Sequence, residues 1–197
     1  MVELLEVHTA SGEPTGIVKS RAAIHADGDW HMAAFVWIFD ARGRALLQRR
    51  ALDKDVWPGF WDASSAGHVQ ASEPIEEAAR RELVEELGLE LEPSALIRDG
   101  LHHEERSHPN GLVDREHHAV FFARVDRPLE AYAPGPEVTA IAFVDAAALA
   151  SNAAELAAET MDSASRTVVR QTLRRDELVV YSPAYLARIA ERARSYY

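Results

Sequence analysis

Short apolar runs separated by turn-forming residues fill much of the chain up to residue 145, and this pattern predicts a series of β-strands. The strongest run, HMAAFVWIFD, is rich in aromatic and β-branched side chains, which pack well on a pleated surface. The turn DARGR and a second run, ALLQRR, follow it as in a hairpin. Further strands are predicted at residues 4–7, 16–19, 96–101, 117–125 and 138–144. ASSAGHVQ is predicted as two short strands around a glycine turn, and SHPNG (107–111) as a loop.

Helical periodicity is clearest over residues 74–87. An apolar residue recurs there at every fourth position, which places one apolar row along a helix. The residues of this row are Ile75, Ala79, Leu83 and Leu87. Pro74 suits the first helical position and Gly88 suits the residue after the last turn. The alanine-rich stretch after residue 145 and the ending ARIAERARSYY predict a helical C-terminal segment over about 146–197.

The order of these elements predicts the fold class. Strands gather around one central helix, and further helices follow at the end of the chain. Such an order indicates an α/β or α+β sandwich with a mixed sheet. Since no linker-like stretch interrupts it, we expect one domain over residues 1–197.

Composition narrows the function classes. The chain has no cysteine, which excludes disulfides, thiolate nucleophiles and Cys-ligated metals and favours a reducing compartment. Its net charge of −11 argues against non-specific binding to nucleic acid or to an anionic membrane. No apolar run reaches the roughly 20 residues of a transmembrane helix, and the N-terminus lacks the pattern of a signal peptide. We therefore expect a cytoplasmic protein with neither nucleic acid nor a membrane as its partner.

Three glutamates gather on one side of the predicted helix, within RRELVEELGL. Glu82, Glu85 and Glu86 fall within about 100° of the helix circumference, beside the apolar row. Like charges in this arrangement repel one another, so the glutamates form either a solvated face or a cation site. Carboxylate oxygens are ligands that suit Mg²⁺ or Mn²⁺. Arg81, one turn before Glu85, is placed to hold a carboxylate.

The longer segment GHVQASEPIEEAARRELVEELGL, residues 67–89, resembles the Nudix box at every fixed position. Those positions hold Gly67, Glu73, Arg81, Glu82, Leu83, Glu85, Glu86, Gly88 and Leu89. The resemblance implies a Nudix-type α/β/α sandwich with a mixed β-sheet, here with the helical C-terminal extension. It also implies hydrolysis of a diphosphate linkage in a nucleoside diphosphate-type or related small molecule, with Mg²⁺ or Mn²⁺ as cofactor.

The resemblance further implies roles for individual residues. Glu82, Glu85 and Glu86 match the metal ligands, with Glu73 assisting, and Arg81 matches the residue that orients a glutamate. A carboxylate near the metal can take the proton of the attacking water. Glu85 and Glu86 are candidates for this base, and the other candidates are Glu104, Glu105 and Glu116. Homodimers are common in the family, so a homodimer is the assembly that the resemblance implies.

A closer resemblance covers roughly residues 3–145. The segments HADGDWHMAAFVWIF, LLQRR and WPGFWDASSAGHV are similar to the branch of the superfamily that contains isopentenyl diphosphate isomerase and its hydrolase-like relatives. Isomerases of that branch have a metal site made of histidine and glutamate. The matching positions are His25, His31, His68, Asp114 and Glu116. The spacing between His25 and His31 is one residue shorter than in the isomerase pattern, and Asp114 stands where a Glu is usual. Whether these residues form a second metal site is therefore a question that the sequence leaves open.

Two departures from the isomerase pattern favour hydrolysis. The position of the catalytic cysteine holds Ala66, and the position of an expected tyrosine maps roughly onto Glu104. The isomerase box is degenerate in the glutamates needed for hydrolysis, whereas this box is complete. Isomerisation of isopentenyl diphosphate is therefore the disfavoured alternative. A Nudix fold that binds a nucleotide without turnover is a third alternative, and the intact box speaks against it.

The segments near the box supply candidates for substrate binding. Arg49, Arg50 and Lys54 can pair with phosphates, although a solvated basic cluster fits the same pattern. Trp57, with Phe60 and Trp61 nearby, can stack on a base or wall a pocket, and ordinary packing is the alternative reading. His68 is a candidate because it directly follows Gly67 beside the metal helix.

Overall fold

The computed structural model describes residues 2–107, 112–151 and 153–195. Residues 108–111 of the predicted loop SHPNG lie outside this range. The strands are β1 (Leu4–His8), β2 (Pro14–Ser20), β3 (Trp30–Phe39), β4 (Arg44–Arg50), β5 (Trp61–Asp62), β6 (Ser65–His68), β7 (Ile97–Ser107), β8 (Val113–Arg124), β9 (Val138–Asp145), β10 (Glu155–Asp162) and β11 (Val168–Arg174). The α-helices are α1 (Arg21–Asp27), α2 (Ile75–Leu87), α3 (Ala146–Ala150) and α4 (Pro183–Arg194). Short 3-10 helices are η1 (Pro93–Ala95), η2 (Leu129–Ala131) and η3 (Arg175–Glu177).

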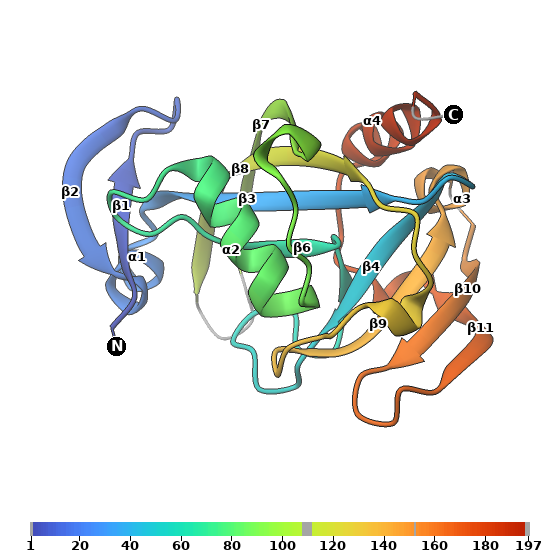
Figure 1. Ribbon diagram of the computed structural model, residues 1–197. Helices are drawn as coiled ribbons and strands as arrows, with labels where there is room; N and C mark the ends of the chain where they lie inside the picture. The colour runs from blue at the N-terminus through green and yellow to red at the C-terminus, as the bar shows by residue number, and fades with distance from the viewer. Residues whose placement is uncertain (1, 108–111, 152, 196–197) are drawn as a thin grey trace.

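Strand β3 is the centre of a mixed sheet. It runs parallel to β8 along its whole length and antiparallel to β6, and β7 extends the sheet beyond β8. Its only pair with β4 among the described residues is Phe39 with Ala45, so the sheet divides beyond that point. The other half continues from β4 through β9 and β10 to β11. Figure 1 shows the β1–β2 hairpin with α1 at one end of β3 and the β10–β11 hairpin at the other.

The two faces of β3 contribute to two separate cores, because successive side chains of a strand point to opposite faces. Met32, Ala34, Val36 and Ile38 pack in one cluster with the apolar row of α2. The residues between them pack in a second cluster, which includes Tyr185 and Ile189 of α4. Helices thus cover both faces of the mixed sheet, and α2 lies in front of β3 and β6 in Figure 1. This arrangement confirms the predicted α/β/α sandwich.

Helix α2 forms as its sequence predicts. Ala79, Leu83 and Leu87 of the apolar row are fully buried, and Ile75 is partly buried against the same core. Glu76 and Glu77 lie in the first turn, where the positive end of the helix dipole favours them. Gly88 ends the helix in the left-handed conformation, with φ 60°, which glycine adopts at little cost. Pro74 precedes the first helical residue as its N-cap, one position earlier than predicted.

The prediction that residues 146–197 are helical is wrong over the middle of that segment. Among the described residues of that segment the α-helices are α3 and α4, and β10 and β11 form an antiparallel hairpin between them. Leu156 and Ala158 are buried at the strand period of two, and β10 also pairs with β9. Alanine favours a helix locally, but this pairing satisfies the backbone and buries one face of β10, which overrides that preference. The predicted C-terminal helix itself is present as α4.

Two other local predictions need correction. Helix α1 was not predicted, since its seven residues are too few for a clear helical period, although Ser20 caps it and Gly28 ends it. The segment ASSAGHVQ does not turn at Gly67, because β6 continues through this residue while pairing with β3. No described helix has the length and apolar character needed to cross a membrane.

Ser64 bridges the place where the sheet divides. Its hydroxyl accepts a hydrogen bond from the Ile38 N–H at 2.7 Å and donates one to the Leu46 carbonyl at 2.6 Å. The side chain is fully buried, so water cannot replace either partner. This one hydroxyl therefore satisfies backbone groups of both β3 and β4.

We predict that Ser64→Ala lowers the free energy of unfolding by about 2–4 kcal/mol, because it strands one buried donor and one buried acceptor. Urea unfolding followed by circular dichroism measures this change. Ser11→Ala is the control, since the Ser11 hydroxyl bonds only at the surface, and its effect should stay within about 0.5 kcal/mol. Equal effects of the two substitutions would contradict the bridging role.

Candidate active site

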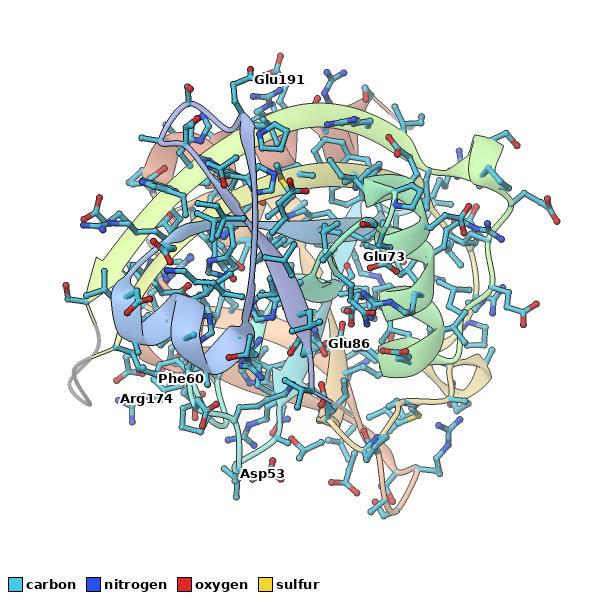
Figure 2. All side chains as sticks on the ribbon, turned by 90° about the vertical axis from the view of Figure 1, so that its left-hand side faces the viewer. Asp53, Phe60, Glu73, Glu86, Arg174 and Glu191 are labelled. Atoms are coloured by element: carbon cyan, nitrogen blue, oxygen red, sulfur yellow. The ribbon has the colours of Figure 1, made fainter. Side chains whose placement is uncertain are left out.

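Helix α2 approaches strand β6 very closely at Gly67. A Cβ at this position would lie 2.1 Å from the carboxyl carbon of Glu82, so only glycine leaves room for that carboxylate. Glu86, one turn later, is 4% exposed. Its Oε2 accepts hydrogen bonds from Nε2 of Gln48 at 3.0 Å and from the N–H of Ala66 at 2.9 Å. Figure 2 shows Glu73 and Glu86 beside α2, with Glu86 on the side toward the middle of the molecule.

The guanidinium of Arg81 joins two carboxylates of α2 to one carboxylate that precedes the helix. It donates to Glu73 from Nε at 2.8 Å and from Nη2 at 2.9 Å. Its Nη1 donates to Glu82 at 2.5 Å and to Glu85 at 3.2 Å. Nη2 also donates to the His68 carbonyl of β6 at 3.0 Å. Arg81 thus holds three glutamates against the strand, and Glu73 acts on Arg81 rather than lining the neighbouring cleft.

Burial makes the charges of this cluster costly. Burial and the neighbouring charge of Glu82 raise the pKa of Glu86 to about 7. Burial also raises the pKa of Glu82, although Arg81 opposes this shift. Burial pushes the pKa of Glu73 upward, but its hydrogen bonds with Arg81 outweigh that effect and lower it. Two partly desolvated carboxylates side by side, with hard oxygen donors, fit a divalent cation such as Mg²⁺ or Mn²⁺.

A second cluster of possible ligands lies next to the first. His25 comes from α1, His31 from β3 and His68 from β6, and their nearest ring nitrogens lie within 4.8 Å of one another. His31 Nε2 lies 3.8 Å from Asp114 Oδ1 and 3.7 Å from Glu116 Oε1, both on β8. His68 Nε2 lies 3.4 Å from Glu116 Oε1. The spacing between His25 and His31, which is one residue shorter than in the isomerase pattern, therefore does not keep these five side chains apart.

The electrostatics of the second cluster differ from one imidazole to the next. Nε2 of His25 and Nε2 of His31 are buried without a hydrogen-bond partner among the described residues. Burial lowers the pKa of His25 to about 4, so its ring is neutral. Burial also lowers the pKa of His68, but hydrogen bonds to Glu116 and Glu3 outweigh it and raise the pKa to about 9. Burial raises the pKa of Asp114 to about 6, with the charge of Glu116 adding to the effect.

Both clusters border one cleft of about 330 Å³. Of the predicted site residues, Arg50, Lys54, Trp57, His68, Arg81, Glu82 and Glu85 line it. Arg50 also pairs with Asp62 at 3.1 Å, and Lys54 pairs with Glu137, so part of their charge is already neutralised. Arg49 does not line the cleft, because its Nε donates to the Gly59 carbonyl at 2.9 Å and its guanidinium lies over the ring of Trp61.

The other residues proposed from the sequence as bases or as aromatic walls also divide into those that line the cleft and those that do not. Glu104 and Glu116 line the cleft, whereas Glu105 is exposed and pairs with Arg115 at 3.0 Å. Trp61 is part of the hydrophobic core, so ordinary packing, and not stacking on a substrate base, describes it. Phe60 packs edge-on against Trp57. Figure 2 places Phe60 in the loop that also carries Asp53.

Several cleft residues have no signal in the sequence. Arg21, Asp62, Arg106 and Tyr181 all contribute to the lining. They come from segments as far apart as α1 and the stretch before α4. No local pattern marks them, because they meet only through tertiary packing, as where the C-terminal segment bridges to Trp61 of β5 and accepts a hydrogen bond from Arg106 of β7.

Comparisons with known proteins agree with this geometry. The family model described as NUDIX domain matches residues 29–168. A protein of Arabidopsis thaliana named Nudix hydrolase 3 is 41% identical over 147 residues, covering 72% of this chain and 19% of that protein. An Escherichia coli protein named isopentenyl-diphosphate Delta-isomerase is 41% identical over 121 residues, covering 61% of this chain and 66% of that protein. The chain thus spans less than two thirds of the length of either relative.

Solved structures show the same fold at low sequence identity. A MutT protein from Methanosarcina mazei aligns with a TM-score of 0.56 at 16% identity, covering 83% of this chain and 94% of that one. A protein from Deinococcus radiodurans aligns with a TM-score of 0.54 at 23% identity, covering 75% and 86%. These likenesses concern the arrangement of the sheet and helices alone.

The raised pKa of Glu86 predicts a pH-dependent stability in the presence of chelator. Its pKa of about 7 in the folded protein exceeds the ordinary value of 4.5, so the favourable contribution is complete below about pH 4.5 and is lost as the pH rises through 7. Glutamine cannot ionise. We predict that Glu86→Gln matches the unchanged protein at pH 5 and exceeds its free energy of unfolding by about 1–3 kcal/mol at pH 8.

Thermal unfolding at pH 5 and pH 8 in chelator checks this prediction. Glu85→Gln is the matched control, because the Glu85 side chain is 59% exposed and its charge is solvated. A Glu86→Gln advantage that is the same at both pH values would show that burial of the charge is not its cause.

Proposed function

The chain belongs to the Nudix family, and on that basis we propose that it is a metal-dependent hydrolase of a diphosphate linkage. The proposed substrate is a nucleoside diphosphate-type or related small molecule, cleaved by attack of water on phosphorus. One observation carries this proposal. The single guanidinium of Arg81 gathers Glu73, Glu82 and Glu85 beside a cleft of about 330 Å³. A cleft of this size is that of a small-molecule site.

Glu82, Glu85 and Glu86 are the proposed ligands of Mg²⁺ or Mn²⁺. When bound, such an ion neutralises diphosphate oxygens and acidifies a water molecule. Arg81 keeps the ligands in place, and Glu73 keeps Arg81 in place through two hydrogen bonds. The ligands therefore need little rearrangement when the substrate arrives.

Other side chains of the cleft have proposed roles in binding and proton transfer. Arg50 and Lys54 supply positive charge toward the phosphates, and Trp57 and His68 wall the site. Glu85 and Glu86 remain the proposed bases for the attacking water. They differ in setting, because Glu85 is exposed and held by one contact with Arg81, whereas Glu86 is buried and holds two hydrogen bonds.

Hydrolysis is favoured over isomerisation despite the similarity to an isomerase. Ala66 lines the cleft where the isomerase pattern has its cysteine, and an alanine methyl group cannot transfer a proton. Glu104 stands near the expected tyrosine, and it is ion-paired with Arg106 at 2.8 Å. The cytoplasmic location, the homodimer and the absence of nucleic-acid or membrane partners stay predictions.

The direct test is a phosphate-release screen over a panel of diphosphates with Mg²⁺, Mn²⁺ or chelator. We predict turnover that depends on the metal and falls at least about 100-fold in Glu85→Gln and in Glu86→Gln. Glu77→Gln is the matched control, because Glu77 is an exposed residue of the same helix that does not occupy a fixed position of the box. Substitution of the glutamate that acts as the base is expected to lower kcat without weakening Mn²⁺ binding. Substitution of a glutamate that acts only as a metal ligand is expected to weaken Mn²⁺ binding.

Isopentenyl diphosphate belongs in the same panel, with its double bond followed by proton NMR. Migration of the double bond without phosphate release would favour the isomerase alternative. Metal-dependent nucleotide binding without any turnover would favour the silent binding module.

We also propose that His25, His31, His68, Asp114 and Glu116 hold a second divalent cation. The observation behind this is the pair of buried Nε2 atoms, on His25 and His31, that have no hydrogen-bond partner among the described residues and belong to these groups of possible ligands. Buried polar atoms of this kind are rare unless a ligand satisfies them. Mixed nitrogen and oxygen donors suit Mn²⁺ or Zn²⁺ better than Mg²⁺.

Metal counting separates the two proposed sites. We predict that Mn²⁺ binds at two classes of site. His25→Gln and His31→Gln should both abolish binding at the second site, whereas Glu86→Gln should weaken binding at the box glutamates. Equilibrium dialysis with elemental analysis measures the stoichiometry, and circular dichroism checks that each variant is folded. His8→Gln is the control, since His8 lies outside both clusters. Unchanged stoichiometry in folded His25→Gln and His31→Gln would rule the second site out.

A further inference from the structure

Arg106 of β7 occupies a wall of the cleft formed by segments far apart in the chain. Its guanidinium carbon lies 5.5 Å from the ring centre of Trp57 and 5.8 Å from that of Tyr181. Trp57 belongs to the loop before β5, and Tyr181 belongs to the segment that leads into α4. The Arg106 side chain is only 17% exposed, so it is enclosed by its neighbours while still bordering the cleft.

Hydrogen bonds fix the Arg106 guanidinium in one orientation. Nε donates to Glu104 Oε1 at 2.8 Å, and Nη2 donates to the Val180 carbonyl. Glu104 is itself held by His102, whose Nε2 lies 3.0 Å from its other oxygen. Nη1 makes no hydrogen bond to any residue within the described ranges. A donor of Arg106 thus remains for a group in the cleft.

The aromatic partners of Arg106 are also held in place. The Tyr181 hydroxyl donates to Asp62, which accepts a second hydrogen bond from Arg50 at 3.1 Å. Trp57 adopts a left-handed backbone conformation, with φ 52°. A bulky residue adopts it at a cost of about 1–3 kcal/mol, so the surrounding structure must impose it. This wall is therefore built before any substrate arrives.

Arg106, Trp57 and Tyr181 form what we call the Arg106 wall, and its chemistry suits polar groups better than apolar ones. An apolar chain placed against it would strip water from the Glu104–Arg106 ion pair and return no hydrogen bond, which is unfavourable. A group with oxygen acceptors, such as the sugar of a nucleotide, can instead accept from Nη1. We propose that Arg106 determines specificity by donating to an oxygen of the group attached to the diphosphate and by disfavouring isoprenoid diphosphates. This inference rests on the proposed function, because it assumes that the diphosphate lies at the box glutamates.

Binding measurements test the inference without needing turnover. Isothermal titration calorimetry with Ca²⁺-loaded protein compares ADP, isopentenyl diphosphate and inorganic pyrophosphate. We expect ADP to bind about 10-fold or more tighter than isopentenyl diphosphate. Arg106→Met should weaken ADP binding about 10-fold or more, the worth of one charged hydrogen bond, and leave pyrophosphate binding unchanged. Arg98→Met on the same strand is the matched control, since Arg98 pairs with Glu76 at the surface.

Each outcome separates the inference from the proposed function. Equal affinity for ADP and isopentenyl diphosphate, or an unchanged preference in Arg106→Met, overturns the role of Arg106 while the hydrolase proposal stands. An equal loss for ADP and pyrophosphate also overturns it, because Arg106 would then bind the diphosphate itself. Absence of pyrophosphate binding contradicts the proposed function and this inference with it. If Arg106→Met does not fold, Arg106→Lys retains the charge and should still weaken ADP binding by loss of the planar fork.

Discussion

The guanidinium of Arg81 is the contact on which the site depends. Alone it binds three carboxylates of the box and the backbone carbonyl of His68, so it ties helix α2 to strand β6. Without that charge, Glu82 and Glu85 would repel each other on adjacent turns. The same guanidinium contacts Glu82 and Glu85, the two of these carboxylates that line the cleft. The contacts that position the carboxylates are therefore the same contacts that fasten α2 to the sheet.

Strand β3 and its partner β6 set the second constraint. The core beneath α2 and the cleft residues Ala33 and Phe35 lie on opposite faces of β3. Glu82 nevertheless reaches the cleft from α2, since Gly67 of β6 has no side chain in its path. His31 and His68, on the same two strands, bring the second cluster next to the first. A short strand with small residues thus lets groups from both faces meet.

Two groups of charged side chains line the cleft, and they differ in chemistry. One group is the box carboxylates Glu82 and Glu85, and burial raises the pKa of Glu82, which a bound cation would relieve. The other group is Glu104 and Arg106, an ion pair held by aromatic rings and backbone. Ala66, which also lines the cleft, offers no acid or base. This lining supports the proposed hydrolysis of a diphosphate over the isomerisation of an apolar chain.

The sequence by itself determined the box, helix α2 and most strands, because residues on one helix or strand keep fixed spacings that periodicity reveals. It also implied the second cluster through resemblance, but only the structure showed its side chains close together. Tertiary structure alone decided that β10 and β11 form a hairpin, that Arg49 does not line the cleft, and that Arg106 and Tyr181 do line it. Those outcomes depend on contacts between different segments of the chain, which the pattern of side chains within any one segment does not encode.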